Sequence, residues 1–390
     1  MNILFLSFHY SPDLSSCSFR SEALVESLNS LMSPGDHLNV ITTLPNRYAS
    51  FDVGAAVHEY DGNVSIERIS IPIHHNGMLD QSRAFIAYAR QVLKQTKDKK
   101  YDLIVATSSR LMTASLAAYI ARSRKIPLYL DIRDIFVDTI KDVLPRGVSW
   151  FFKPVFDLLE RWTIHTASRV NLVSRGFEGY FESKYPGSVF SYFTNGVDES
   201  FVNAPPQDFH SEKNDTLHVV YAGNIGEGQG LHKFLPEFAS ALKGRVRFSV
   251  YGGGGRRAAL ETILDSGGVD NVEVHDPISR PELIKVYQHA DVLLIHLNNY
   301  DAFLKVLPSK LFEYAATGKP ILAGVSGYSA GFIRSNISNS AIFEPCDVKS
   351  AIIALSELKI EMVYRDDFVR EYSRKLIMQC MASDVVSLVD

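Results

Sequence analysis

Lys305-Val-Leu-Pro-Ser-Lys-Leu-Phe-Glu313-Tyr-Ala-Ala-Thr-Gly-Lys-Pro-Ile-Leu322 contains the start of a helix, its end and the beginning of a buried strand. We expect Pro308 at the first position of the helix. The first N–H groups of a helix have no partner within it, so a proline, which lacks an N–H, costs nothing there. Gly318 and Pro320 predict the end of the helix, and the apolar residues 321–325 predict the strand. A helix that leads into a buried strand is the repeating element of a doubly wound α/β fold.

The start of this predicted helix also has the composition of an anion site. The N–H groups of Ser309, Lys310 and Leu311 would point out of the helix end, where its dipole is positive, and Lys310 adds a mobile cation. Glu313 is placed to accept hydrogen bonds from ribose hydroxyls. With Pro308, these residues predict a site for a nucleoside diphosphate. The spacing equally allows an amphipathic core helix with a solvated Glu313.

Composition narrows the class of protein. The chain has 390 residues, of which 46% are hydrophobic and 22% charged, which is typical of a globular protein of about two domains. Its net charge of −4 argues against nucleic acid as a partner. Three scattered cysteines predict neither a disulfide framework nor a metal pair, and they fit a reducing cytosol. We expect no signal peptide and no membrane-spanning segment.

Strands and helices alternate along both halves of the chain. The apolar strands are covered on both faces, so the sheets should be mostly parallel, with ligands bound beyond the carboxyl ends of the strands in a cleft between the halves. A polar, proline-containing stretch after residue 203 marks the boundary. The predicted domains are residues 1–202 and 203–368, followed by a helix at 369–390. Strands are expected at 2–8, 37–43, 64–69, 103–107, 128–132, 170–174, 217–223, 246–252, 272–275 and 292–296, and helices at 20–32, 82–96 and 112–124.

Two glycine-rich loops follow strands of the second half. The first, Gly223-Asn-Ile-Gly-Glu-Gly-Gln-Gly230, opens a helix and could let the backbone approach a phosphate. The second is Gly252-Gly-Gly-Gly255, followed by Arg256. Tight strand-to-helix connections use such loops equally often. Neither loop has the Gly-Lys-Ser/Thr of a P-loop, and the first strand of the chain is not followed by a dinucleotide fingerprint, which argues against ATPases and NAD enzymes.

Several motifs together resemble one family, the retaining nucleotide-sugar glycosyltransferases of family 4. The resemblance covers nearly the whole chain. Within the family, the chain is similar to the bacterial subgroup that builds surface polysaccharides, which includes amino-sugar transferases of the WbuB type. Its anchors are Phe8-His-Tyr-Ser-Pro12, Leu44-Pro-Asn46, Asp131-Ile-Arg-Asp134, Asn195-Gly-Val-Asp198, Gly223-Asn-Ile-Gly226, Gln229-Gly-Leu231 and Leu307-Pro-Ser-Lys-Leu-Phe-Glu313.

The resemblance implies a GT-B fold, in which two Rossmann-like domains face a central cleft and the C-terminal helix crosses back to the N-terminal domain. It also implies transfer, with retention, of an N-acetylated amino sugar or similar hexose from a nucleotide-diphosphate donor. UDP is favoured over GDP as the nucleotide. The expected acceptor is a polyprenyl-diphosphate-linked sugar, the expected location is the cytoplasm or the cytoplasmic face of the inner membrane, and no cofactor or metal is required.

The chain departs from the family pattern around the expected diphosphate site. Lys305 stands where the family has the first of two glutamates, and Glu313 is the second. Asn224 and Gln229 stand where many members have an arginine and a lysine. Since the charge of a leaving diphosphate must be stabilised, we infer that Lys305, Lys310 and Arg256 supply cations instead. Together with Gly223, Gly226, Gly253, Pro308, Ser309 and Leu311, these residues form the predicted donor site.

Candidates in the N-terminal half lie at or after strand ends. His9, Arg133 and Asp134, together with Lys305 and Lys310, are predicted to act in catalysis, and Arg20, Asp131 and Asn195 to line the acceptor side. Each has a structural alternative. His9 could be a satisfied structural histidine, residues 131–134 a salt-bridged loop, and the Asn-Gly at 195–196 a plain turn. A further departure is Ser15-Ser16, where the family has Gly-Gly.

Residues 143–162 combine aromatic and basic side chains. Trp150, Phe151 and Phe152 beside Lys153 are typical of a helix that lies in a membrane interface, and lysines at 94–100 could add attraction to anionic lipid. An ordinary helical hairpin packed on the N-terminal sheet is the alternative. Two other functions also remain open, namely a nucleotide-sugar 2-epimerase of GT-B fold and a non-catalytic partner protein.

Overall fold

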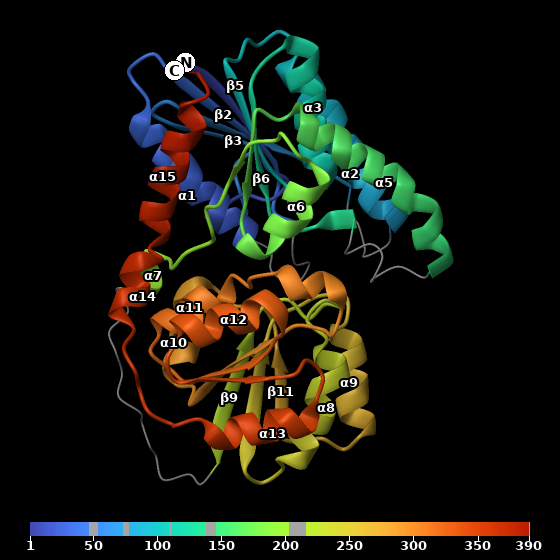
Figure 1. Ribbon diagram of the computed structural model, residues 1–390, viewed down its shortest axis with the longest axis vertical. Helices are drawn as coiled ribbons and strands as arrows, with labels where there is room; N and C mark the ends of the chain where they lie inside the picture. Colours follow the sequence, from blue (N-terminus) through green and yellow to red (C-terminus); the bar gives the residue numbers. More distant parts are fainter. Residues whose placement is uncertain (47–53, 73–77, 109–110, 138–145, 203–215, 390) are drawn as a thin grey trace. The chain divides into compact units, whose positions relative to one another are not determined.

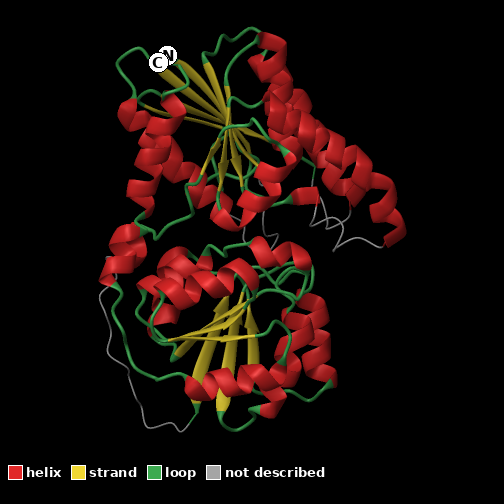
Figure 2. Ribbon diagram, viewed as in Figure 1, coloured by secondary structure: helices red, strands yellow, loops and turns green. Residues whose placement is uncertain are grey.

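The chain folds into two compact α/β units, each built on its own sheet (Figures 1 and 2). The computed structural model describes residues 1–46, 54–72, 78–108, 111–137, 146–202 and 216–389. The first unit contains residues 1–195 and 375–390, and the second contains residues 196–374. The predicted fold class, two doubly wound domains, is confirmed.

The first unit has a sheet of order β3-β4-β2-β1-β5-β6-β7-β8. Every pair is parallel except the β3–β4 hairpin, which is antiparallel. Its strands are β1 (Asn2–Leu6), β2 (His37–Thr43), β3 (His58–Asp61), β4 (Val64–Ile69), β5 (Leu103–Ser108), β6 (Leu128–Ile132), β7 (Arg169–Leu172) and β8 (Phe190–Ser191). Its helices are α1 (Ser16–Leu31), α2 (Met78–Thr96), α3 (Leu111–Arg124), α5 (Arg146–Thr166), the short 3-10 turn η1 (Arg175–Phe177), α6 (Glu178–Lys184) and α15 (Arg374–Val386).

Helices α1 and α15 cover one face of this sheet, and α2, α3 and α5 lie on the other side (Figure 1). Ile3 and Phe5 of β1 face the α1–α15 side, where they pack with Leu24 and Leu28 of α1. Met381 of α15 belongs to the same core and is fully buried. Helix α15 therefore belongs to the first unit although the second unit precedes it in the chain.

The second unit has an all-parallel sheet of order β11-β10-β9-β12-β13-β14. Its strands are β9 (Leu217–Ala222), β10 (Val246–Tyr251), β11 (Val272–His275), β12 (Val292–His296), β13 (Ile321–Gly324) and β14 (Ser340–Phe343). Its helices are α7 (Glu199–Val202), α8 (Leu231–Ala241), α9 (Arg257–Ser266), α10 (Arg280–Gln288), the 3-10 turn η2 (Asp301–Lys305), α11 (Lys310–Ala316), α12 (Gly327–Asn336), α13 (Val348–Glu357) and α14 (Asp366–Glu371).

Alternate residues of β9 enter two separate cores, as expected for a strand buried on both faces. Val219 packs with Phe234 and Phe238 of α8 on one face. Val220 packs on the other face with residues of α10 and α11, including Tyr287. The continuous apolar runs of the sequence therefore correspond to strands between two helical layers.

The boundaries between the units differ from the predicted 202 and 368. Residues 196–202 pack on the second unit, because Val197 pairs with Ser373 and Phe201 stacks on Tyr287 with ring centroids 5.9 Å apart. Gly196 has φ +72°, and a Cβ there would lie 2.8 Å from the Cα of Arg374. Only glycine allows this approach. The return segment 369–374 also stays with the second unit.

Helix α1 begins earlier than predicted. The side chain of Ser15 accepts a hydrogen bond from the N–H of Ser18, 3.1 Å away, and so caps a helix that starts at Ser16 rather than near Arg20. Among the residues that the structure describes, no helix is long and apolar enough to cross a membrane.

His296 and Gly324 pack tightly in the core of the second unit. The His296 ring stacks on Phe234 with centroids 4.5 Å apart. The N–H of Cys346 donates to its Nε2 at 3.0 Å, so its Nδ1 carries the proton and donates to the carbonyl of Gln229 at 2.6 Å. A Cβ on Gly324 would lie 2.4 Å from His296 and 2.5 Å from Phe343.

We predict that Gly324→Ala destabilises the protein by about 1–3 kcal/mol, because the buried rings beside it cannot move aside freely. Gly331→Ala is the matched control. Gly331 lies within α12, and nothing lies within 4 Å of the position that an added methyl group would take, so alanine should stabilise the helix by about 0.5–1 kcal/mol. Urea unfolding of both variants measures the difference, and two shifts of the same sign would contradict the packing argument.

We predict that neutral His296 contributes to acid sensitivity. Burial lowers its pKa from 6.5 to about 4, against the opposing effect of its bond to Gln229. The unfolded chain therefore binds more protons between these pH values, and about 3 kcal/mol of stability is lost as the pH falls from 6.5 to 4. His296→Phe should reduce the fall in melting temperature between pH 7 and pH 5, whereas His58→Gln, at an exposed site, should not. An unchanged fall in His296→Phe would show that other groups cause it.

Candidate functional site

The strand order places one topological switch point in each sheet. From β9 the chain adds β10 on one side and β12 on the other, and from β1 it adds β2 and β5. Loops that follow the two central strands diverge there, which leaves room for a ligand at the carboxyl ends. In the second unit this point is occupied by the glycine loop 223–230, and in the first unit by the loop that contains His9.

Backbone contacts hold the glycine loop 223–230 against the loop after β10. The N–H of Gly223 donates to Tyr251 at 2.8 Å, and that of Ile225 donates to the carbonyl of Gly253 at 2.7 Å. A Cβ on Gly252 would lie 1.9 Å from the carbonyl oxygen of Gly223, so this glycine is required by packing between the loops. The role seen for the second loop is therefore to support the first one.

The end of β12 holds the other side of the glycine loop. His296 binds the carbonyl of Gln229, and the N–H of Asn298 donates to Gly228 at 2.8 Å. The Asn298 amide also donates to the carbonyl of Glu227 at 2.8 Å. The loop is thus fixed from both neighbouring strands before any ligand binds.

Lys310 of α11 reaches this loop. Its Nζ donates to the hydroxyl of Tyr221 at 2.8 Å and lies 3.9 Å from the centre of that ring. The end of the lysine side chain occupies the space beside the Cα of Gly223, where a Cβ would lie 2.1 Å from it. Burial lowers the pKa of Lys310 to about 7, and Glu313 acts against this shift. An anion that binds here would restore the positive charge.

Glu313 lies near two arginines of the second unit. Its Oε1 is 3.7 Å from Nη2 of Arg280, and its side chain is 14% exposed. Burial raises the pKa of the Glu313 carboxyl, while Arg280 and Arg374 act to lower it. The alternative of a fully solvated Glu313 is therefore wrong.

The helix start differs from the prediction. Helix α11 begins at Lys310, with Ser309 as its N-cap, and not at Pro308. The N–H of Leu311 donates to the carbonyl of Pro308 at 3.1 Å, because residues 308–311 form a turn, so it is not available to a ligand. Lys310 and Glu313, rather than three free N–H groups, are the distinctive chemistry of this segment.

The loop residues predicted to grip the donor bind each other or other protein groups. Nδ2 of Asn224 donates to Gln229 at 2.7 Å. Arg256 donates to Glu227 at 2.6 Å, and its side chain is about half exposed. Although burial acts to raise it, hydrogen bonds from Lys233, Tyr300 and Arg256 lower the pKa of Glu227 to about 2. Arg256 is therefore paired with Glu227, which also binds Lys233, and its contact with a diphosphate stays a prediction. Lys305 ends the turn η2 and is partly exposed.

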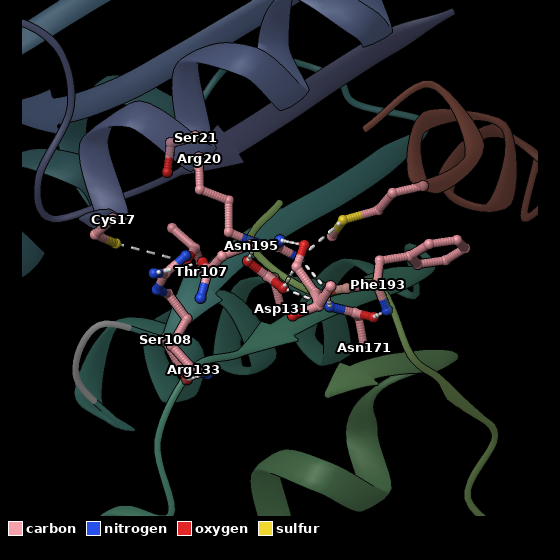
Figure 3. A network of polar contacts seen from close by, with 12 residues as sticks. Cys17, Arg20, Ser21, Thr107, Ser108, Asp131, Arg133, Asn171, Phe193 and Asn195 are labelled. Atoms are coloured by element: carbon pink, nitrogen blue, oxygen red, sulfur yellow. Dashed lines mark hydrogen bonds and ion pairs between the residues drawn. The ribbon is translucent and has the colours of Figure 1, made fainter. Parts of the chain in front are cut away.

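Figure 3 shows a buried network at the carboxyl end of β6 in the first unit. Arg20 of α1 donates to both oxygens of Asp131, at 2.8 and 2.9 Å, and the two residues are 1% and 2% exposed. Arg20 also donates to the carbonyls of Phe193 and Thr194, and Asn171 donates to Asp131 at 2.7 Å. Arg20 and Asp131 therefore join α1 and β6 to the connection after β8, and their contact with an acceptor stays a prediction.

Arg133 lies at the edge of this network. Its Nη2 donates to Asn195 at 3.1 Å (Figure 3). The same Nη2 also donates to Ser16 at 3.2 Å. Asn195 is 4% exposed and its side chain accepts the hydrogen bond from Arg133, so the residues at 195–196 form part of this network as well as a turn. Arg133 is partly exposed and Asp134 is exposed, so both are accessible to a ligand.

His9 is paired with an acid that the sequence analysis did not single out. Its Nδ1 lies 2.9 Å from Oδ2 of Asp13, and both side chains are nearly buried, at 6% and 5% exposed. An aspartate at Nδ1 fixes the orientation and tautomer of a histidine. The spacing of four residues in a loop carries no periodic signal, so only the structure reveals this pair.

The predicted membrane-facing residues Trp150, Phe151 and Phe152 fall in the part of α5 whose side chains lie outside the described part of the chain. Further along α5, Val155 and Leu158 are 60% and 69% exposed. They lie three residues apart and therefore on one face of the helix. Both residues lie within the segment 143–162 that is predicted to face a membrane, although that prediction rests on the aromatic residues at 150–152.

Comparison with known proteins agrees with the two-unit structure. Residues 22–188 match the family described as a glycosyl transferase 4-like domain, and residues 205–375 match glycosyl transferases group 1. The chain is 23% identical over 405 residues to the putative colanic acid biosynthesis glycosyl transferase WcaI of Escherichia coli K12, with 97% of this chain and 96% of that protein covered.

Two solved structures have the same fold over nearly their full lengths. HepE of Anabaena, in complex with UDP and glucose, gives a TM-score of 0.64 at 14% identity, with 100% of this chain and 97% of that chain covered. WaaG, a glycosyltransferase involved in lipopolysaccharide biosynthesis, gives a TM-score of 0.67 at 15% identity, with 99% and 97% covered. These structures show the GT-B fold, and the two family matches, one in each unit, show that the chain belongs to the glycosyltransferases with a 4-like domain followed by a group 1 domain.

Proposed function

We propose that this glycosyltransferase moves a hexose, an N-acetylated amino sugar or a similar one, from a UDP-linked donor to a lipid-linked sugar during surface polysaccharide synthesis, with retention at the anomeric carbon. The observation that carries the proposal is that Lys310 lies against the glycine loop 223–230, with Glu313 about one helical turn further along α11. A cation and a carboxylate one helical turn apart match a diphosphate and a ribose, which are neighbours in a nucleoside diphosphate.

Lys310 is suited to stabilise the leaving group. Its partner is the neutral hydroxyl of Tyr221, and its pKa of about 7 means that it can take up a proton when a diphosphate arrives. Negative charge grows on the diphosphate as the bond to the sugar breaks, and a nearby cation stabilises that state more than the bound substrate. We propose that Lys310, with Lys305, does this without an obligatory metal ion.

The names of the relatives guide the choice of substrates. HepE binds UDP and glucose, which favours UDP as the nucleotide. WcaI is named for colanic acid biosynthesis and WaaG for lipopolysaccharide biosynthesis, which favours a surface-polysaccharide acceptor carried on a lipid. We assign acceptor contacts to the carboxyl edge of the first sheet, where His9, Arg133 and Asp134 lie.

We also propose that the protein works at the cytoplasmic face of the membrane that holds its acceptor. Val155 and Leu158 of α5 expose apolar surface beside the exposed Lys153 and Arg161. Apolar side chains flanked by cations favour the interface of an anionic bilayer.

We predict that UDP raises the melting temperature of the protein more than GDP or ADP does, equally with Mg²⁺ and with EDTA. Lys310→Ala should weaken UDP binding about tenfold to hundredfold, since a hydrogen bond to a charged group contributes about 1.5–3 kcal/mol. It should affect UMP less, because UMP lacks the second phosphate. Glu313→Ala should weaken both nucleotides, because both contain the ribose.

Lys285→Ala, at an exposed position of α10, is the control and should leave UDP binding unchanged. Turnover of the donor without any acceptor would instead indicate an epimerase. Binding of UDP without transfer to any lipid-linked acceptor would indicate a non-catalytic partner protein. If no nucleotide changes the melting temperature, the proposal is wrong.

We predict that the full-length protein binds liposomes that contain anionic lipid, and that the double variant Val155→Ser, Leu158→Ser binds about tenfold more weakly, because it loses apolar surface. Ile353→Ser removes a similarly exposed apolar side chain, 59% exposed on α13 of the second unit, and should bind like the wild type. Flotation measures all three. Equal binding by the double variant and the wild type would exclude this face of α5.

A further inference from the structure

We infer that Arg280 is a positioning residue for Glu313, held in place by Asp198 and Ser200 of the segment that follows the unit boundary. This inference rests on the proposed contact between Glu313 and the ribose of the donor. It adds to that proposal a residue far from Glu313 in sequence, and it gives the Asn195-Gly-Val-Asp198 motif a role in the donor site.

Three contacts fix the Arg280 side chain from the 196–202 segment. Nε donates to Oγ of Ser200 at 2.9 Å, and Nη2 lies 3.0 Å from Oδ2 of Asp198. The guanidinium lies over the ring of Phe201, with Cζ 4.9 Å from its centre. The same Nη2 is 3.7 Å from Oε1 of Glu313. The guanidinium thus has a defined place between the two carboxylates.

Asp198 is itself fixed by several groups. The N–H and the hydroxyl of Ser200 donate to its Oδ1 at 2.9 and 2.6 Å. Arg374, which is 4% exposed, donates to its Oδ2 at 2.8 Å and to the carbonyl of Gly196 at 3.3 Å. Asp198 therefore connects the segment that enters the second unit with the segment that leaves it, and it holds Arg280 toward Glu313.

The charges explain why Glu313 needs Arg280. An ionised carboxylate accepts hydrogen bonds at both of its oxygens, whereas a protonated carboxyl group carries a donor on one of them, so the ionised form suits two ribose hydroxyls better. Burial opposes ionisation of Glu313, and Arg280 is the largest of the effects that favour it, followed by Arg374, while Asp198 opposes it and Lys310 favours it. Arg280 thus opposes the rise in the pKa of Glu313 and favours the ionised form of its carboxyl group.

Other titratable groups around α11 have smaller effects on Glu313. Tyr287 of α10 and His296 of β12 are buried and neutral near pH 7. The charged side chains of α7 and α14, which pack on α11, are solvent-exposed: Glu199, Asp366, Asp367, Arg370 and Glu371.

The test is the pH dependence of UDP binding by the full-length protein, measured by calorimetry between pH 8 and pH 5.5. Without Arg280 the pKa of Glu313 rises further, so Arg280→Gln should bind UDP about tenfold more weakly than the wild type at pH 5.5, and by a smaller factor at pH 8. Comparison with the wild type at each pH cancels the titration of UDP itself. Arg280→Lys should restore part of the binding at low pH, because it keeps the charge.

Further variants separate the effect of Arg280 on Glu313 from other causes of weaker binding. In Glu313→Gln, which has no carboxyl to ionise, adding Arg280→Gln should cause no further change with pH. Ser200→Ala removes the contact to Nε of Arg280 and one hydrogen bond to Asp198. It should show a smaller pH-dependent loss of UDP binding than Arg280→Gln, and it replaces Arg280→Gln in the test if that variant does not fold. Arg334→Gln, at an exposed site of α12, should match the wild type.

The outcomes separate the two proposals. If Glu313→Gln binds UDP as the wild type does, the proposed donor contact is wrong. A second outcome is that Glu313→Gln weakens UDP binding, while the UDP affinities of Arg280→Gln and Ser200→Ala relative to the wild type do not change with pH. In that case the donor contact stands and the inference about Arg280 is overturned.

Discussion

The buried ion pair between Arg20 and Asp131 is the interaction on which the first unit depends. A charge removed from water is tolerated only when every polar atom of the pair finds a partner. Here the partners come from β7, from the connection after β8 and from α1, so the pair joins elements that are distant in sequence. The same network places Asn195 against Arg133, which leaves one guanidinium at the accessible edge of the sheet.

In the second unit, too, charged side chains that are partly removed from water need partners, but one of them lacks a charged hydrogen-bond partner. Asp198 pairs with two arginines, and Glu227 pairs with Lys233 and Arg256, so each of these cations has a carboxylate partner within the protein. Lys310 is different, because its hydrogen-bond partner at the glycine loop is a neutral phenol. Its charge is costly until an anion arrives. The contrast separates charges that hold the fold from the charge that we assign to substrate.

The sequence was sufficient for most of the strands and for their alternation with helices, because apolar runs and glycine signals are local. It also located Lys310 and Glu313, which lie three residues apart. It did not reveal contacts between residues far apart in the chain, such as Arg280 with Glu313 or Arg20 with Asp131. The boundary at 202 was misplaced for a related reason, since composition marks a polar linker but not the unit on which the preceding residues pack. The pair of His9 and Asp13 was not predicted, because residues of a loop have no regular spacing that would indicate a contact.

Asn224 and Gln229 show how the donor site can lose its loop cations and keep its chemistry. The two amides bind each other and close the loop without any charge, while Lys310 approaches the same loop from α11. A cation on a helix is held more rigidly than one on a loop, so less conformational entropy is lost when it binds a diphosphate. The burial that lowers the pKa of Lys310 also makes its interaction with an anion stronger than it would be in water. Replacing two loop cations by one partly buried lysine on a helix is therefore compatible with catalysis.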